Sequence, residues 1–194
     1  MASPATYFDA LYTHSDDPWS VRTRWYERRK RAITMASLPR ERFSRALEIG
    51  CSIGEVSAEL VHRCEHLLAI DGSESAASAA RDRLRGSSAT TVQHMRVPRE
   101  WPQGAFDLIV LSEVAYYLSE DEWRTTIQRC LESLAPGGMV LLCHWLGTAD
   151  DFAQTGEQVH RIFRDESALG ALVMHRESDF LLEIFAAEGG QSND

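Results

Sequence analysis

Residues 46–54, Ala-Leu-Glu-Ile-Gly-Cys-Ser-Ile-Gly, form the most informative stretch of the chain. A short apolar run enters a turn that contains Gly50 and Gly54, and a helical pattern starts at Glu55. Glycines at such a turn leave out the side chains that would keep a ligand away from the backbone. The helix that follows presents free N–H groups to the same place. The stretch therefore predicts a strand, a ligand-binding turn and a helix in succession.

An acidic residue further along the chain completes this pattern. Asp71 follows the next apolar run, residues 67–70, and lies seventeen residues beyond Gly54. A carboxylate at the end of a second strand can accept hydrogen bonds from the two hydroxyls of a ribose. The turn and the carboxylate together predict a pocket for a cofactor that contains adenosine.

The spacing of the glycines separates two classes of such cofactors. Dinucleotide-binding folds use G-x-G-x-x-G, which lets the backbone approach a pyrophosphate. Here three residues separate Gly50 from Gly54, and the acidic Glu48 precedes the first glycine. A carboxylate at that position would repel phosphate and suits a cationic ligand. We therefore expect S-adenosylmethionine, which carries an ammonium and a sulfonium but no phosphate, with S-adenosylhomocysteine as the product.

Four segments of the chain are similar to motifs of one enzyme superfamily. They are the first turn, the acidic end of the second strand, the fourth strand and the turn before the fifth strand, at residues 48–54, 70–71, 106–113 and 134–138. On these segments the chain resembles the class I S-adenosylmethionine-dependent methyltransferases over residues 43–146.

Two short runs resemble a narrower family. Asp-Asp-Pro-Trp at 16–19 and Leu-Ser-Glu-Val-Ala-Tyr-Tyr-Leu at 111–118 are similar to the rhizobial nodulation N-methyltransferases (the NodS-like family). Members of that family methylate an amino sugar of a chito-oligosaccharide. The resemblance implies a lid that excludes water from the site. Trp19 of this lid would contact the cofactor, and Asp16 would contact the substrate.

Strands and helices alternate along the chain, which predicts an α/β fold. We expect a doubly wound, mostly parallel seven-stranded sheet with helices on both faces, the Rossmann-like methyltransferase fold, and an N-terminal helical lid. At 194 residues one domain is expected, over residues 1–188. The lid and first helix would span 1–42, the cofactor-binding core 43–146, and a substrate-side helix with a final hairpin 147–188. The polar tail, 189–194, is expected to be disordered.

The local patterns also predict the bounds of individual elements. They predict helices over 19–37, 55–63, 75–85, 120–134 and 155–167, and strands over 45–49, 66–70, 90–95, 106–112, 139–145, 171–176 and 180–186.

Composition excludes several classes of function. A net charge of −9 disfavours binding of nucleic acid, and no apolar run is long enough to span a membrane. The N-terminus lacks the basic and apolar regions of a signal peptide. Four scattered cysteines without C-x-x-C spacing indicate reduced thiols rather than disulfides or a metal site. We expect a cytoplasmic monomer or homodimer that acts on a small molecule or an oligosaccharide, without a metal.

Ligands of open α/β sheets bind beyond the carboxyl ends of the strands. We therefore expect the cofactor to contact the lid, the first turn and the strand ends, at Trp19, Glu48, Gly50, Cys51, Ser52, Gly54, Asp71, Gly72, Ser73, Met95, Arg96, Val97, Ser112 and Glu113. The superfamily usually has an acidic residue where this chain has Arg96. An arginine cannot accept a hydrogen bond from the adenine amino group. A backbone carbonyl must do so, or the adenine is held only by stacking between Met95 and Val97.

Methyl transfer is a displacement at carbon, so the acceptor must be positioned with its lone pair free. An amine arrives mostly protonated and must lose a proton. Glu113, Tyr117 and His144 are the predicted catalytic residues, because all follow predicted strands four and five. Glu113 can pair with a cation, Tyr117 can face one with its ring, and His144 can act as a base near neutral pH. Tyr116 and Trp145 are expected to contact the substrate.

The favoured hypothesis is N-methylation of an amine such as an amino sugar. An O-methyltransferase of a small metabolite remains open, as does a non-catalytic protein that binds S-adenosylmethionine. Methyltransferases of bases and proteins often carry an Asn/Asp-Pro-Pro-aromatic run after strand four, whereas residues 112–115 are Ser-Glu-Val-Ala. The missing third glycine disfavours a nicotinamide-dependent oxidoreductase.

Overall fold

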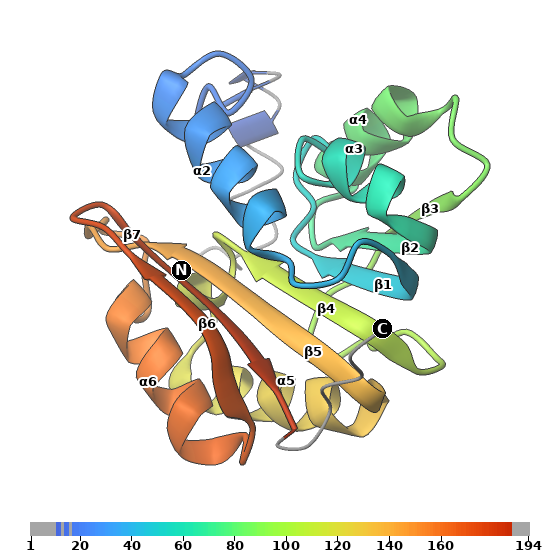
Figure 1. Ribbon diagram of the computed structural model, residues 1–194. Coiled ribbons are helices and arrows are strands. Elements are labelled where there is room, and N and C mark those ends of the chain that lie inside the picture. The colour runs from blue at the N-terminus through green and yellow to red at the C-terminus, as the bar shows by residue number, and fades with distance from the viewer. Residues whose placement is uncertain (1–10, 13, 16, 188–194) are drawn as a thin grey trace. The chain divides into compact units, whose positions relative to one another are not determined.

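The computed structural model describes residues 11, 12, 14, 15 and 17–187 (Figure 1). The chain forms two compact units, residues 1–96 and 97–194, called unit 1 and unit 2 below. The single domain expected over 1–188 stays a prediction. The tail at 189–194, expected to be disordered, lies outside the described residues.

Unit 1 contains three parallel strands in the order β3-β2-β1 (Figure 1). The strands are β1 (Phe43–Ile49), β2 (Cys64–Asp71) and β3 (Thr90–His94). The helices are α2 (Trp25–Ser37), α3 (Ser57–Leu60), the 3-10 helix η1 (Val61–Arg63) and α4 (Glu74–Leu84). Because the strands are parallel, the carboxyl ends of β1 and β2 lie at the same edge, where the predicted ligand-binding turns begin.

The small buried side chains of helix α4 allow the turn after β1 to pack closely against it. Its N-cap residue, Ser73, accepts a hydrogen bond from the amide of Ala76 at 3.3 Å. The buried face of the helix is mostly alanine and contacts β2 and β3. Gly54 has a φ of +80°, and a Cβ atom there would lie 3.3 Å from Ala80. Small residues on both sides therefore hold the turn after β1 against α4.

A buried carboxylate links the beginning of the chain to α4. Glu55 is 8% exposed and forms ion pairs with three arginines. Arg83 of α4 lies 3.0 Å from it, Arg22 lies 3.3 Å away, and Arg31 of α2 lies 3.4 Å away. Because Glu55 follows directly after Gly54, the same contacts hold the end of the first turn.

Another arginine, Arg63, holds the segment between α2 and β1. The guanidinium of Arg63 donates to the carbonyl of Met35 at 3.0 Å and to that of Glu41 at 2.6 Å, and also to the carbonyl of Arg40. Carbonyls at the C-terminal end of a helix lack partners within the helix. Arg63 supplies one of these partners for α2 and fixes the chain as it enters β1.

Unit 2 contains four strands in the order β4-β5-β7-β6. The strands are β4 (Phe106–Ser112), β5 (Leu134–Trp145), β6 (Gly170–Arg176) and β7 (Phe180–Ala186). Strands β4 and β5 are parallel, and β7 is antiparallel to both β5 and β6. The helices are the 3-10 helix η2 (Ala115–Tyr117), α5 (Glu120–Ser133) and α6 (Gly156–Glu166). Helices α5 and α6 pack against each other and against β5 (Figure 1).

Both long helices of unit 2 begin with a capping box. Ser119 and Glu122 form the box of α5, and Thr155 and Gln158 form that of α6. A Cβ atom on Gly156 would lie 2.4 Å from the carbonyl oxygen of residue 145. Glycine is therefore required where the first turn of α6 meets the end of β5.

Most predicted elements agree with the structure to within two residues. The helix predicted from residue 19 begins only at Trp25, because the side chain of Asp17 holds a turn by accepting from the amides of Val21 and Arg22. Strand β5 begins at Leu134 rather than at 139, because this extension pairs with the start of β4 across an irregularity. Within the described residues, no helix is both long and apolar enough to cross a membrane.

Replacement of Glu55 tests whether its ion pairs stabilise unit 1. Glu55→Ala should lower the free energy of unfolding by about 1–3 kcal/mol, because it leaves partly buried arginines without their acceptor. Urea denaturation of both proteins measures this difference. Glu132→Ala, which removes an exposed pair with Arg129, is the control and should unfold at the same urea concentration as the unmodified protein. Equal midpoints for all three proteins would contradict the assignment.

Candidate functional site

The carboxylate of Asp71 organises the turns that follow β1 and β2. One of its oxygens accepts a hydrogen bond from the amide of Ser52 at 2.8 Å, and the other accepts from the amide of Ser73 at 2.8 Å. An ionised carboxylate only accepts, and each of its oxygens can accept more than one hydrogen bond. The predicted residues Ser52, Asp71 and Ser73 are therefore brought together at the carboxyl ends of parallel strands.

The backbone of the first turn needs its glycines. Gly50 has a φ of 77° and Gly54 a φ of 80°, and Ser52 between them also has a positive φ, 51°. The amides of Gly50 and Cys51 both donate to the carbonyl of Ile70, at 2.8 and 3.0 Å. A side chain at Gly50 would strain this left-handed conformation. The bond from the Ser52 amide to Asp71 helps to stabilise this conformation at Ser52, which has a side chain.

Glu48 is buried and mainly uncharged in this state. It is 2% exposed, and its carboxyl accepts a hydrogen bond from the Ser57 hydroxyl at 2.5 Å. Burial raises the pKa of Glu48 from 4.5 to about 8; the hydrogen bond opposes this shift, and the charge of Asp71 adds to it. A cation beside this group would favour the carboxylate. The site therefore fits a cationic ligand and disfavours a phosphate.

An aromatic residue that the sequence did not single out as a site residue lies on the first turn. The hydroxyl of Tyr12 is 2.5 Å from that of Ser52, and the Tyr12 ring meets the predicted cofactor residue Trp19 edge-on at 5.8 Å. Burial and the charge of Asp71 raise the pKa of Tyr12, so the phenol stays protonated. Asp16, predicted to contact substrate, lies outside the described residues.

The residues predicted after β3 surround the carbonyl of Gly72. His94 Nε2 lies 3.0 Å from this oxygen, and Arg96 Nε donates to it at 3.4 Å. The amide of Met95 donates to the carbonyl of Asp71 at 2.8 Å. The guanidinium of Arg96 is therefore directed to backbone. Val97 is the first residue of unit 2.

In unit 2, Glu113 lies directly after β4 in a left-handed conformation, with a φ of 56°. Its amide donates to the carbonyl of Cys143 at 2.9 Å. Cys143 is also the residue that pairs with Ser112 in the sheet. Its carboxylate accepts from the Tyr116 hydroxyl and from the amide of Trp145 at 3.3 Å. The structure thus brings together four predicted residues of unit 2, Ser112, Glu113, Tyr116 and Trp145.

Phe152 lies among the aromatic residues of this site and was missed by the sequence analysis. Its ring stacks on that of Tyr116 with centroids 3.9 Å apart. It meets Tyr117 edge-on at 5.1 Å and Trp145 edge-on at 6.2 Å. No periodic pattern marks a residue in the loop after β5, so the sequence carried no signal for it. Tyr116 is buried, whereas Tyr117 is half-buried and is the more accessible phenol.

His144 is fully buried, and both of its ring nitrogens have partners. Its Nε2 atom accepts a hydrogen bond from the amide of Ala115 at 3.2 Å. Its Nδ1 atom lies 3.1 Å from Nε2 of His160, a second buried histidine. The role of His144 as a base stays a prediction. In this structure the lone pair on its Nε2 atom accepts the hydrogen bond from the Ala115 amide.

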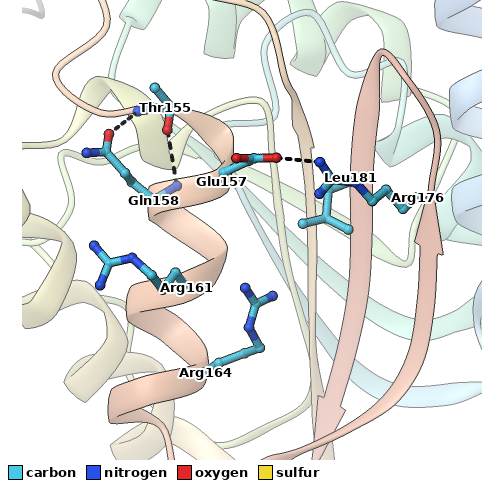
Figure 2. A pocket seen from close by; sticks show the side chains of 7 residues that line it. All are labelled: Thr155, Glu157, Gln158, Arg161, Arg164, Arg176 and Leu181. Carbon is cyan, nitrogen blue, oxygen red and sulfur yellow. Dashed lines mark hydrogen bonds and ion pairs between the residues drawn. The ribbon is translucent and has the colours of Figure 1, made fainter.

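A groove of about 490 Å³ lies between α6 and the β6–β7 hairpin (Figure 2). It is lined by Thr155, Glu157, Gln158, Arg161, Arg164, Arg176 and Leu181. Each arginine faces an acid: Arg161 pairs with Asp165, Arg164 with Glu183, and Arg176 with Glu157. The groove contains none of the predicted site residues.

The cysteines and the acidic residues do not assemble a metal site in the described part of the chain. Over residues 17–187 and the four described positions before them, no group of three potential ligands could hold a metal ion. All four cysteines are buried thiols, and none forms a disulfide within the described residues.

Comparison with known proteins gives a consistent result. The family model of nodulation protein S (NodS) matches residues 10–151. Nodulation protein S of Rhizobium tropici is 33% identical over 126 residues, which cover 64% of this chain and 53% of that protein. The chain thus spans about half the length of that relative.

Two solved structures are similar over most of the chain. N-methyltransferase NodS from Bradyrhizobium japonicum WM9, in complex with S-adenosylhomocysteine, has a TM-score of 0.84 at 27% identity and covers 95% of this chain and 98% of its own. A candidate methyltransferase from Pseudomonas syringae has a TM-score of 0.77 at 42% identity, covering 84% and 99%. The predicted fold class, a mostly parallel seven-stranded α/β sheet of the methyltransferase type, is confirmed by these matches. The chain belongs to the nodulation protein S family.

Proposed function

We propose that the protein is an S-adenosylmethionine-dependent methyltransferase that methylates the nitrogen of an amine. The proposed acceptor is an amino sugar, free or within an oligosaccharide. The observation that carries this proposal is the Asp71 carboxylate, held between the amides of Ser52 and Ser73 at the ends of two parallel strands. Family membership supports it, since one member is an N-methyltransferase solved with S-adenosylhomocysteine.

Unit 1 supplies groups that suit the adenosine and amino-acid parts of such a cofactor. The Asp71 carboxylate, at the end of a second parallel strand, suits the hydroxyls of a ribose. The carboxyl group of Glu48 would favour a positively charged part of the ligand. Further proposed contacts are Trp19, Gly50, Cys51, Gly54, Gly72, Met95 and Arg96 in unit 1, and Val97, Ser112 and Glu113 in unit 2.

Unit 2 supplies groups that suit an amine. The Glu113 carboxylate accepts hydrogen bonds from the Tyr116 hydroxyl and from the backbone amide of Trp145. Carboxylates and aromatic faces both attract ammonium groups. When bound, S-adenosylmethionine supplies a methyl group on a sulfonium. Glu113 would orient the amine and take its proton, and Tyr117 would hold its position. Asp16, Tyr116 and Trp145 are proposed substrate contacts, and His144 is considered further below. A cytoplasmic location and a monomeric or homodimeric state complete the proposal.

A binding test and an activity screen address the function directly. S-adenosylhomocysteine should raise the melting temperature and NAD should not, because only a ligand that binds the native state stabilises it. Radiolabelled S-adenosylmethionine should then transfer methyl to members of a panel of amino sugars, de-N-acetylated chito-oligosaccharides and simple amines. The matching N-acetylated sugars are the control, since they lack a basic nitrogen. Stabilisation without transfer to any acceptor would instead favour a non-catalytic binding protein.

With an active acceptor, Tyr117→Phe should lower kcat by about 10- to 1,000-fold, the range of positioning and proton-transfer effects. Affinity for S-adenosylhomocysteine should stay unchanged. The control is Tyr26→Phe, which changes a tyrosine of α2 outside the proposed site and should keep full turnover. Unchanged turnover in Tyr117→Phe would remove Tyr117 from the acceptor site.

The cofactor contacts predict a graded set of affinities. Asp71→Ala should weaken S-adenosylhomocysteine by about 1–3 kcal/mol through loss of charged hydrogen bonds. Gly50→Val should abolish binding, because valine does not tolerate a φ of 77°. Arg96→Ala keeps the backbone of this proposed contact and removes a side chain that donates to the Gly72 carbonyl. It should change the affinity by less than about tenfold, roughly 1.4 kcal/mol. Calorimetric affinities equal to wild type for Asp71→Ala and Gly50→Val would disprove the pocket.

The raised pKa of Glu48 predicts a proton released on cofactor binding. In the free protein the pKa is about 8, above its ordinary value of 4.5, so the folded state holds more protons than the unfolded state between these pH values. Stability contributed by Glu48 is therefore full below about pH 4.5 and is lost as the pH rises to 8. A cationic ligand would lower this pKa and expel the proton.

Calorimetry at pH 7 in buffers with different ionisation enthalpies measures this release. Wild type should release a proton when it binds S-adenosylhomocysteine, and Glu48→Gln should release less. The melting temperature of ligand-free Glu48→Gln should also exceed that of wild type at pH 8 and approach it at pH 5. Equal proton release by the two proteins would show that Glu48 does not respond to the ligand.

A further inference from the structure

A chain of hydrogen bonds crosses unit 2 from the proposed acceptor site to Arg164. At the acceptor site, the amide of Ala115 donates to Nε2 of His144 at 3.2 Å. Nδ1 of His144 lies 3.1 Å from Nε2 of His160, and Nδ1 of His160 lies 2.7 Å from Glu183. Arg164 then donates to the same oxygen of Glu183 at 2.6 Å. The chain thus joins η2, β5, α6 and β7.

The first donor fixes every proton in this chain. A backbone amide can only donate, so Nε2 of His144 must carry a lone pair and the proton of the neutral ring must lie on Nδ1. That proton is donated to Nε2 of His160, which leaves the proton of His160 on Nδ1, facing the carboxylate of Glu183. Each histidine is therefore restricted to one tautomer, and a second proton on either ring would break a bond.

Charge and burial agree with this assignment. His144, His160 and Glu183 are each 0% exposed. Burial lowers the pKa of His160, which favours the neutral ring. The charged groups that act on it are Glu183 on β7, Arg164 on α6 and Glu113 after β4. Arg164 balances the buried carboxylate from the wall of the α6 groove (Figure 2).

The amide held by His144 begins the segment that carries the acceptor-site tyrosines. Ala115 is the first residue of η2, followed by Tyr116 and Tyr117. The side chain of Gln154 donates to the carbonyl of Leu118 at 2.8 Å, so η2 is held from both ends. An imidazole in the other tautomer would present an N–H to the amide of Ala115 and lose this bond. The tautomer of His144 therefore decides whether its ring helps to hold the start of η2.

We propose that His160 and Glu183 are positioning residues of the methyl-transfer site, which fix His144 in its Nδ1–H tautomer so that it holds η2 and the side chain of Tyr117 in place. The proposal rests on the proposed function. It assigns His144 a positioning role instead of that of a base. The pH dependence of turnover should then reflect the acceptor amine rather than an imidazole.

Nitrogen-15 NMR of the histidine rings tests the tautomers without any assay of activity. In the wild-type protein His144 and His160 should both show a protonated Nδ1 and an unprotonated Nε2, unchanged between pH 6 and 8. In Glu183→Leu the His160 tautomer should no longer be fixed. Glu183→Gln should restore it, because the amide oxygen can still accept from Nδ1. A protonated Nε2 on His144 in wild type would overturn the proposal.

Kinetics then separate positioning from stability. His160→Leu should lower kcat by about 10- to 100-fold, because a small displacement of Tyr117 would misalign the acceptor. The KM for the amine and the affinity for S-adenosylhomocysteine should change by less than about threefold. Ile162→Ala, which removes a buried side chain of α6 outside the chain of hydrogen bonds, is the matched control and should keep turnover despite lower stability.

Full turnover in His160→Leu, or an equal loss in Ile162→Ala, would show that His160 and Glu183 only contribute to core packing. If His160→Leu does not fold, Glu183→Leu and Glu183→Gln decide by the same kinetic comparison. Should no acceptor be methylated, the proposed function fails, while the NMR result still establishes or rejects the fixed tautomers.

Discussion

The interaction on which unit 1 depends is the pair of hydrogen bonds from backbone amides to the carboxylate of Asp71. A charged acceptor at the end of a strand must be satisfied, and here the amides of Ser52 and Ser73 do so from two different turns. This allows Ser52 to keep a positive φ and places the turn between Gly50 and Gly54 against the alanine face of α4. The carboxylate thus shapes the site before any ligand arrives.

Unit 2 uses a carboxylate in a similar way. Glu113 also follows a strand and accepts a hydrogen bond from backbone, at the amide of Trp145; here the carboxylate residue itself has the positive φ. Its second partner is the hydroxyl of Tyr116, whose ring stacks on Phe152. The acid and the aromatic residues therefore fix one another. Polar networks of this kind are stable only when every member is satisfied, which favours a single arrangement.

The elements and the first turn were predictable because their signals are local. Apolar runs, N-caps such as Ser73 and the glycine spacing each lie within a few residues. Tyr12, Phe152 and the His160–Glu183 pair were not predictable, because their roles depend on residues 23 to 40 positions away. His160 lies on a helix face that otherwise packs as core, and Glu183 interrupts an apolar strand. Only the pairing of α6 with β7 reveals why these polar groups are buried.

The groups beside the proposed acceptor site favour an amine over an alcohol. An alcohol holds its proton far more tightly than an ammonium, so O-methylation calls for a strong base close to the acceptor. The imidazole of His144 has its lone pair bonded to the Ala115 amide, and Tyr116 donates its own proton to Glu113. What remains is a carboxylate among aromatic rings, which binds a cation well and removes only a weakly held proton. Fold alone does not distinguish the two acceptors. The proposal of transfer to nitrogen therefore depends on the site, on the Glu113 carboxylate and the bonded imidazole of His144.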